Sequence, residues 1–136
     1  MLGFSAWLRC LKWRVRYLLR LRGAPKDYRQ RLVTHAEHLD EYCSRWLGYC
    51  QLPYTSADEL FDSGLFVVLD AASRVANRDL MRVAGSVPAS VHREWVNYWN
   101  YLLQVKQNSS KSKAHAEELN EKLLAFVREV RLSALR

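Results

Sequence analysis

Five stretches of this sequence repeat apolar residues at every third or fourth position, the spacing that gathers them on one face of an α-helix. Glycine, proline and short polar runs separate these stretches from one another. The 136 residues include only 5 Gly and 3 Pro, too few for the many turns of an all-β fold. The sequence therefore predicts an all-α protein.

Four of the five stretches have the pattern of core helices joined by short connections. Ser56 and Glu59 form a capping box that starts the second of them, and the block 64–69, apolar on all sides, predicts a fully surrounded central helix. This helix is expected to run on to Ala84 with a kink near Asn77. The four helices, at about 28–50, 57–84, 89–106 and 114–134, predict an antiparallel four-helix bundle core (residues ~28–134) in a domain of residues 27–136.

The same periodicity predicts which side chains form the core of the bundle. Residues three or four positions apart on a helix share one face, and the apolar members of each series are expected to point inward. In the first, third and fourth helices these are Leu32, Ala36, Leu39, Cys43, Trp46 and Cys50, then Val91, Trp95, Trp99, Leu102 and Val105, then Leu119, Leu123, Phe126, Val127 and Val130.

The charge of the chain is divided unevenly along its length. Residues 1–26 contain seven basic side chains and no acidic one, whereas residues 27–136 contain 14 of each sign. The formal net charge of +7 therefore belongs entirely to the N-terminal segment. The three cysteines, an odd number, predict reduced thiols and a cytoplasmic protein.

That N-terminal segment predicts an additional helix, a basic amphipathic one over residues 1–24 that ends at Gly23 and Pro25. Six cations within residues 9–22 exclude a membrane-spanning helix, since each would cost roughly 2.5–3.5 kcal/mol at the bilayer centre. Lys and Arg on one face with Leu, Phe and Trp on the other are typical of a helix that lies in the membrane interface. Its cationic face is Arg9, Lys12, Arg16 and Arg20, and its apolar docking face is Phe4, Trp7, Leu11 and Leu18.

We therefore expect a non-enzymatic helical interaction module that docks on an anionic surface, through peripheral attachment to the inner leaflet of a membrane. One alternative is a small helical nucleic-acid-binding subunit of a nucleoprotein complex, although the bundle helices are expected to add no basic stripe. Another is an acidic protein partner, with the apolar face of the N-terminal helix buried in the core. In a eukaryote, an Arg-rich amphipathic helix without acids also fits a mitochondrial transit peptide.

The residues that could carry chemistry in the bundle are few. His35, His38 and Glu41 repeat every three residues and could share a metal ion, but a solvated polar face is the favoured interpretation. Arg29 stands six residues before His35, which fits the loose Arg-x4–6-His spacing of HEPN-type ribonucleases. The spacing alone is weak, and a ribonuclease stays the second alternative.

Two further groups are expected to belong to the core. Cys43 with a nearby histidine could form a nucleophile and base, but it falls on the apolar stripe of its helix. The aromatic cluster Trp95, Tyr98, Trp99 and Tyr101 could stack bases, but it has few cations beside it. The sequence predicts no catalytic residue, no metal site, no cofactor and no small-molecule substrate.

Overall fold

The computed structural model describes residues 12, 28–50, 52 and 55–134. The predicted all-α fold is confirmed, because the described residues form helices and connections with no strand among them. In chain order, the helices are α2 (Tyr28–Cys50), α3 (Ala57–Phe61), α4 (Gly64–Arg82), the short 3-10 helix η1 (Ala84–Ser86), α5 (Ala89–Gln107) and α6 (Lys113–Ala134). Of the predicted N-terminal helix only Lys12 is described, and it is helical and exposed.

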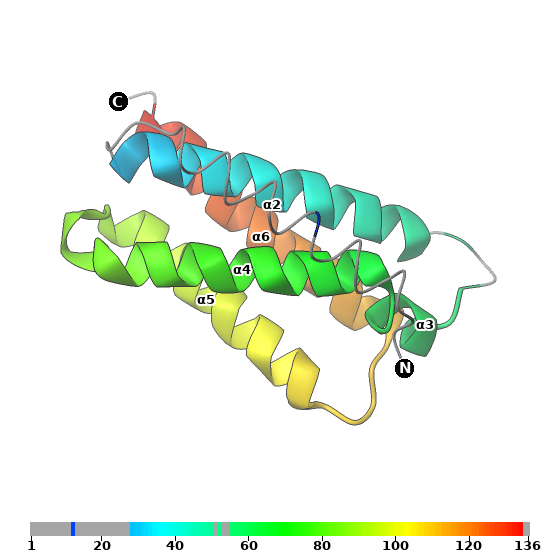
Figure 1. Ribbon diagram of the computed structural model, residues 1–136. Coiled ribbons are helices and arrows are strands. Elements are labelled where there is room, and N and C mark those ends of the chain that lie inside the picture. Colours follow the sequence, from blue (N-terminus) through cyan, green and yellow to red (C-terminus); the bar gives the residue numbers. More distant parts are fainter. Residues whose placement is uncertain (1–11, 13–27, 51, 53–54, 135–136) are drawn as a thin grey trace.

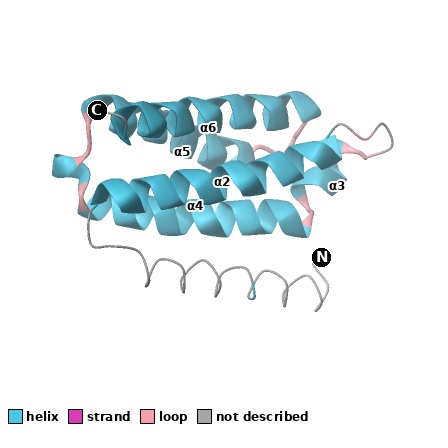
Figure 2. Ribbon diagram, turned by 90° about the horizontal axis from the view of Figure 1, so that it is seen from above, coloured by secondary structure: helices cyan, strands magenta, loops and turns pink. Residues whose placement is uncertain are grey.

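The four long helices form an antiparallel up-and-down bundle, as the sequence predicts. Figure 1 shows α2 and α5 running in one direction and α4 and α6 in the other. Helix α2 packs against both α4 and α6, and α6 packs against α5, whereas α4 touches α5 over a smaller area. Figure 2 shows the same four helices from above, with α3 at one end of the bundle and η1 at the other.

The predicted single helix over 57–84 is wrong, because the chain breaks between α3 and α4. Ser56 caps α3 as expected, accepting a hydrogen bond from the Glu59 amide at 3.2 Å. Ser63 then caps α4, since its hydroxyl accepts from the Phe66 amide at 3.3 Å and donates to the Leu60 carbonyl at 2.8 Å. These bonds satisfy backbone groups that a continuous helix would otherwise pair, so the break is locally stable.

Two further details of α4 differ from expectation. The helix continues without interruption through Asn77, whose side-chain oxygen accepts a hydrogen bond from Trp95 Nε1 at 2.9 Å. The apolar block 64–69 is only partly surrounded: Phe66, Val68 and Leu69 are buried, whereas Leu65 is half-buried. One outer side of α4 therefore reaches the surface of the described fold.

The predicted core is confirmed almost throughout. One continuous cluster joins the inward faces of all four long helices and α3. Trp46, Phe61 and Phe66 meet ring against ring at the α3 end, and Trp46 Nε1 donates to the Leu60 carbonyl at 2.9 Å. Trp99 is half-buried rather than buried, and the side chain of Cys50 lies outside the described residues.

Candidate functional site: an arginine-bordered pocket between α2 and α4

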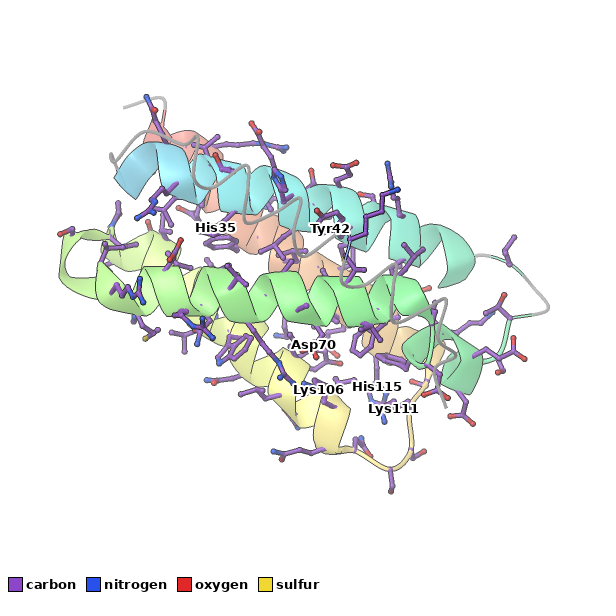
Figure 3. The ribbon with its side chains drawn as sticks, viewed as in Figure 1. His35, Tyr42, Asp70, Lys106, Lys111 and His115 are labelled. Atoms are coloured by element: carbon purple, nitrogen blue, oxygen red, sulfur yellow. The ribbon has the colours of Figure 1, made fainter. Side chains whose placement is uncertain are left out.

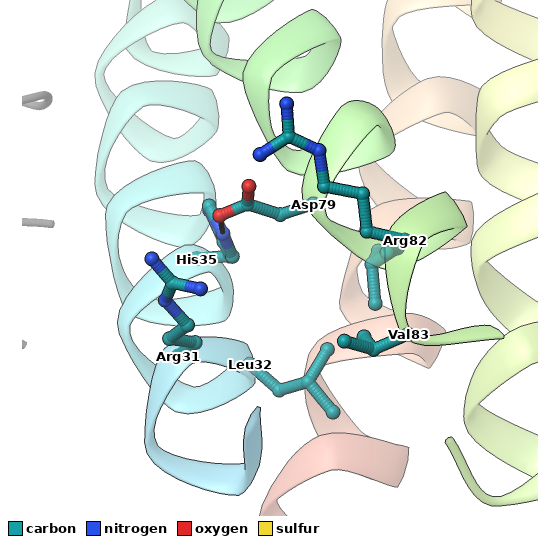
Figure 4. Close-up of a pocket in the computed structure, with 7 residues that line it drawn as sticks. Arg31, Leu32, His35, Asp79, Arg82 and Val83 are labelled. Atoms are coloured by element: carbon teal, nitrogen blue, oxygen red, sulfur yellow. Dashed lines mark hydrogen bonds and ion pairs between the residues drawn. The ribbon is translucent and has the colours of Figure 1, made fainter. Parts of the chain in front are cut away.

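A small pocket of about 50 Å³ opens on the seam between the first turns of α2 and the last turns of α4. Figure 4 shows the arginines contributed by the two helices on its border. Its lining combines an apolar part, made by Leu32, Leu80 and Val83, with the polar side chains of Arg31, His35, Asp79 and Arg82.

The polar part of the pocket is built on a hydrogen bond between side chains of the two helices. His35 Nε2 lies 2.9 Å from a carboxylate oxygen of Asp79, and the His35 side chain is fully buried while Asp79 is 19% exposed. The hydrogen bond with His35 lowers the pKa of Asp79, and the charges of Arg31 and Arg82 lower it further against the opposing effect of burial. Asp79 is therefore a carboxylate at neutral pH and accepts a hydrogen bond from His35 Nε2.

The expectation that the histidines of α2 lie on a solvated polar face is wrong. His35 and His38 are both buried, because α2 packs against α4 on one side and α6 on the other and so buries a wider arc than one apolar stripe. His38 Nδ1 donates to the Thr34 carbonyl at 2.9 Å. Glu41 is exposed and pairs with Arg45, so the three residues do not converge on one point.

Helix α4 exposes a row of arginines beside the pocket, which corrects the expectation that the bundle adds no basic stripe. Arg74, Arg78 and Arg82 follow one another at one-turn spacing and are all exposed. Arg74 lies 3.4 Å from Asp70, but Arg78 and Arg82 form no ion pair with any residue that the structure describes. We call Arg31, Arg78 and Arg82 the arginine edge.

The arginine edge lies at one end of a bundle whose charges are separated. Its residues belong to the start of α2 and the end of α4. The opposite end, where Figure 1 shows α3, exposes three acidic residues, Asp58, Glu59 and Asp62. The three residues of the arginine edge and the three exposed acids of α3 therefore lie at opposite ends of the bundle once the helices are arranged antiparallel, while Lys111 and Lys113 also lie at the α3 end.

Cys43, the candidate nucleophile of α2, belongs to the core, as predicted. Cys43 is fully buried and its thiol donates to Asn120 Oδ1 at 3.3 Å. Burial raises the pKa of Cys43 to about 12, with a smaller contribution from the charge of Asp40. Because only the thiolate is a good nucleophile, this side chain fills space and does not serve nucleophilic chemistry.

The aromatic cluster on α5 also fills the core, as predicted. Trp95 and Tyr98 are fully buried, and Trp99 stacks on Trp95 with ring centroids 6.1 Å apart. Tyr101 is half-buried and donates its hydroxyl hydrogen to Glu118 at 2.9 Å. Trp95 and Tyr98 are thus withdrawn from any surface that could stack bases.

The residues predicted to bind an anionic surface fall almost wholly outside the described part of the chain. Only Lys12 is described, and it is exposed. Arg9, Arg16 and Arg20 and the apolar face of Phe4, Trp7, Leu11 and Leu18 lie outside it, as does the side chain of Arg29. The arginine edge was missed from the sequence, although the four-residue spacing of the α4 arginines was visible there.

The described residues contain neither a cluster of metal ligands nor a helix that could span a membrane. No three His, Cys, Asp or Glu side chains in the described ranges gather closely enough to hold a metal ion. In the same ranges, every helix is too short or too polar to cross a bilayer. Comparison with known proteins gives no match to a family model, to a curated protein or to a solved structure.

Proposed function

We propose that this protein is a non-enzymatic interaction module that attaches peripherally to an anionic membrane surface through its N-terminal segment. The observation that carries the proposal is the charge division, with seven basic and no acidic residues in 1–26 and no net charge in the rest. A segment of this kind is drawn to a negatively charged leaflet, where each Lys or Arg contributes roughly 1 kcal/mol of attraction. Its large apolar residues add the burial that holds an interfacial helix in place.

The bundle supports a docking role because its interior is occupied by packing. Its buried thiol has a raised pKa and its buried aromatics contact one another. The pocket between α2 and α4 is small and is filled at its polar side by the pair of His35 and Asp79. These features favour a rigid body carried by the N-terminal segment over a site for a small-molecule substrate.

A second candidate function is nucleic-acid binding, and the arginine edge favours it. Arginine pairs with phosphate oxygens through two parallel hydrogen bonds, and Arg78 and Arg82 stand one turn apart with their charges unpaired among the described residues. The burial of Trp95 and Tyr98 argues against recognition of single-stranded bases. Binding to duplex phosphates would therefore be the form of this function to test.

The experiment is sedimentation of the full chain with vesicles of phosphatidylcholine alone or of phosphatidylcholine with phosphatidylserine. We expect binding to the anionic vesicles, and its loss when Arg9, Lys12, Arg16 and Arg20 are changed to Glu. The matched control changes Arg45, Arg93, Arg128 and Arg131 to Glu, which alters the net charge by the same amount on exposed positions outside the N-terminal segment. The helical circular dichroism signal checks that each variant is folded.

The outcomes separate the candidates. Retained binding in the control together with lost binding in the N-terminal variant supports the proposal. Equal loss in both variants contradicts it, because net charge alone would then explain the binding. A wild-type chain that ignores anionic vesicles but retards a duplex oligonucleotide, with a steep salt dependence, replaces the membrane function with the nucleic-acid one.

A further inference from the structure

We infer that the arginine edge is a second membrane contact, which turns the bundle so that the pocket end faces the anionic leaflet and the α3 end faces away. The inference rests on the proposed membrane function and adds an orientation to it. An N-terminal segment alone could tether the bundle in any orientation. A second cationic contact on the rigid body would fix one.

The charges of the arginine edge are available to an external anion. Arg31, Arg78 and Arg82 are exposed and form no ion pair with the described residues. Two exposed basic residues of α5 and α6 are paired within the bundle: Arg93 lies 3.6 Å from Glu94, and Arg131 lies 3.2 Å from Asp40. Arg128 of α6 is exposed and, like the arginine edge, forms no ion pair with a described residue. A leaflet would therefore meet three free cations together at this edge, whereas Arg128 is a single such cation on α6.

The carboxylate of Asp79, which lies beside the arginine edge, does not cancel the positive charge of that edge. Asp79 is directed at the buried His35 and only 19% of its side chain is exposed. Its single negative charge stands against the three positive charges of the arginine edge. The charge balance of the arginine edge with Asp79 is therefore positive.

An exposed methionine supplies the apolar component that an interfacial surface needs. Met81 lies between Arg78 and Arg82 in the sequence of α4, and 48% of its surface is exposed. A flexible thioether side chain can enter the headgroup region while long arginine side chains keep their guanidinium groups at the phosphates. Apolar and cationic groups are thus combined on the same helix turn.

The edge is also continuous along the chain with the proposed membrane anchor. Helix α2 begins at Tyr28, directly after the basic segment 1–26, and Arg31 lies in its first turn. The anchor therefore joins the bundle at the arginine end. The acidic residues of α3, Asp58, Glu59 and Asp62, lie at the other end and are repelled by the same leaflet.

The test attaches an environment-sensitive fluorophore at either end of the full chain. Cys10 and Cys50 are changed to Ser, and Cys43 stays because its buried thiol will not react in the folded protein. A cysteine is then introduced by Met81→Cys or, as the matched control, by Asp58→Cys, and each is labelled. On adding phosphatidylserine-containing vesicles with a quencher on the headgroup, we expect quenching at position 81 and none at position 58.

A second arm measures affinity. The double change Arg78→Glu with Arg82→Glu should weaken binding to these vesicles by at least about tenfold, given the attraction contributed by each basic residue. Arg45→Glu with Arg93→Glu removes the same charge from positions that are already paired, and should change the affinity by much less. Arg78→Gln with Arg82→Gln repeats the test without adding acids, should the first pair unfold the protein.

The results test the orientation of the bundle separately from membrane binding itself. Equal quenching at both positions, or stronger quenching at 58, overturns the orientation while vesicle binding still supports the anchor. Equal weakening by the two charge-reversal pairs also overturns it. A wild-type chain that does not bind the vesicles at all overturns the proposed function and the orientation together.

Discussion

His35 and Asp79 are 44 residues apart in the chain, yet the imidazole Nε2 and the carboxylate meet at 2.9 Å across the seam of α2 and α4. The imidazole is fully buried and the carboxylate sits at the mouth of the pocket. The pair therefore fastens the first turns of α2 to the last turns of α4. It also holds the two helices that carry the arginine edge in a fixed relation.

Changing Asp79 to Asn should reduce the free energy of unfolding by about 1–3 kcal/mol, because it removes a charged hydrogen-bond acceptor from a buried imidazole. Urea denaturation at neutral pH measures the change. Glu41→Gln, which breaks only an exposed pair with Arg45, is the control and should cost at most about 0.5 kcal/mol. Equal effects of the two changes would contradict the structural role of the pair.

The same variant has a defined pH dependence. Because the pKa of Asp79 in the folded protein lies below the ordinary value of 3.8, the unfolded chain binds the proton more readily. The stabilisation by the carboxylate is complete above that ordinary pKa and is lost as the pH falls through the lower, folded value. The difference in stability between wild type and Asp79→Asn should therefore narrow in acid, and a constant difference would contradict the assignment.

Removing the buried hydroxyl of Ser73 should lower the free energy of unfolding more than removing that of Tyr98. Ser73 Oγ donates its one hydrogen to the Leu69 carbonyl at 2.7 Å, so the Tyr98 hydroxyl, also 2.7 Å away, donates to Ser73. Ser73→Ala leaves the Tyr98 hydroxyl unsatisfied and should cost about 1–3 kcal/mol, whereas Tyr98→Phe should cost roughly 0.5–1.5 kcal/mol. Denaturation of both variants in urea checks the order, and the reverse order would show that the hydroxyl hydrogens point the other way.

Asp70 on α4 has two cationic partners, Lys106 on α5 and the exposed Arg74 on α4. Lys106 should contribute more to the stability of the fold than Arg74. Lys106 Nζ lies 3.0 Å from both carboxylate oxygens of Asp70, and Figure 3 shows the two side chains reaching between the helices. Lys106→Met should cost roughly 1–2 kcal/mol of stability. Arg74→Met removes the exposed partner of the same carboxylate and should stay within about 0.5 kcal/mol of wild type. Thermal unfolding of the two variants measures the difference, and similar losses would contradict it.

Cys43 should resist alkylation as long as the protein is folded. Burial raises the pKa of its thiol to about 12, so almost none is thiolate at mildly alkaline pH. Peptide mass spectrometry after iodoacetamide treatment should show Cys43 unmodified in buffer and modified in urea. Modification in buffer at the rate seen in urea would show that the bundle opens at this point.

The spans of the long helices could be predicted because apolar periodicity is a local property. Residues 28–50 coincide with α2, and the predicted helices 89–106 and 114–134 differ from α5 and α6 by one residue at one end. The break before Gly64 could not be foreseen, because a serine cap and a continuing helix differ by only about 1 kcal/mol. The hydrogen bonds of Ser63 to Leu60 and Phe66 favour the break, and the apolar periodicity of the sequence does not reveal them.

The site was harder to predict than the fold because it depends on contacts between helices. Nothing within α2 indicates that His35 is buried against Asp79, since the partner lies on α4. The four-residue spacing of Arg78 and Arg82 can be read from the sequence. Whether the two side chains form ion pairs depends on which acidic residues the fold brings near them. The separation of basic and acidic ends likewise exists only once the helices are arranged antiparallel.

Peripheral attachment to a membrane is tested most directly by the binding of the full chain to anionic vesicles across a salt series, with binding to a duplex oligonucleotide measured in the same buffers. We expect binding to phosphatidylserine-containing vesicles and little binding to phosphatidylcholine alone. The affinity should fall as salt is added but should not vanish, because the insertion of apolar side chains does not depend on salt. A chain that stays in solution with anionic vesicles at low salt would contradict it.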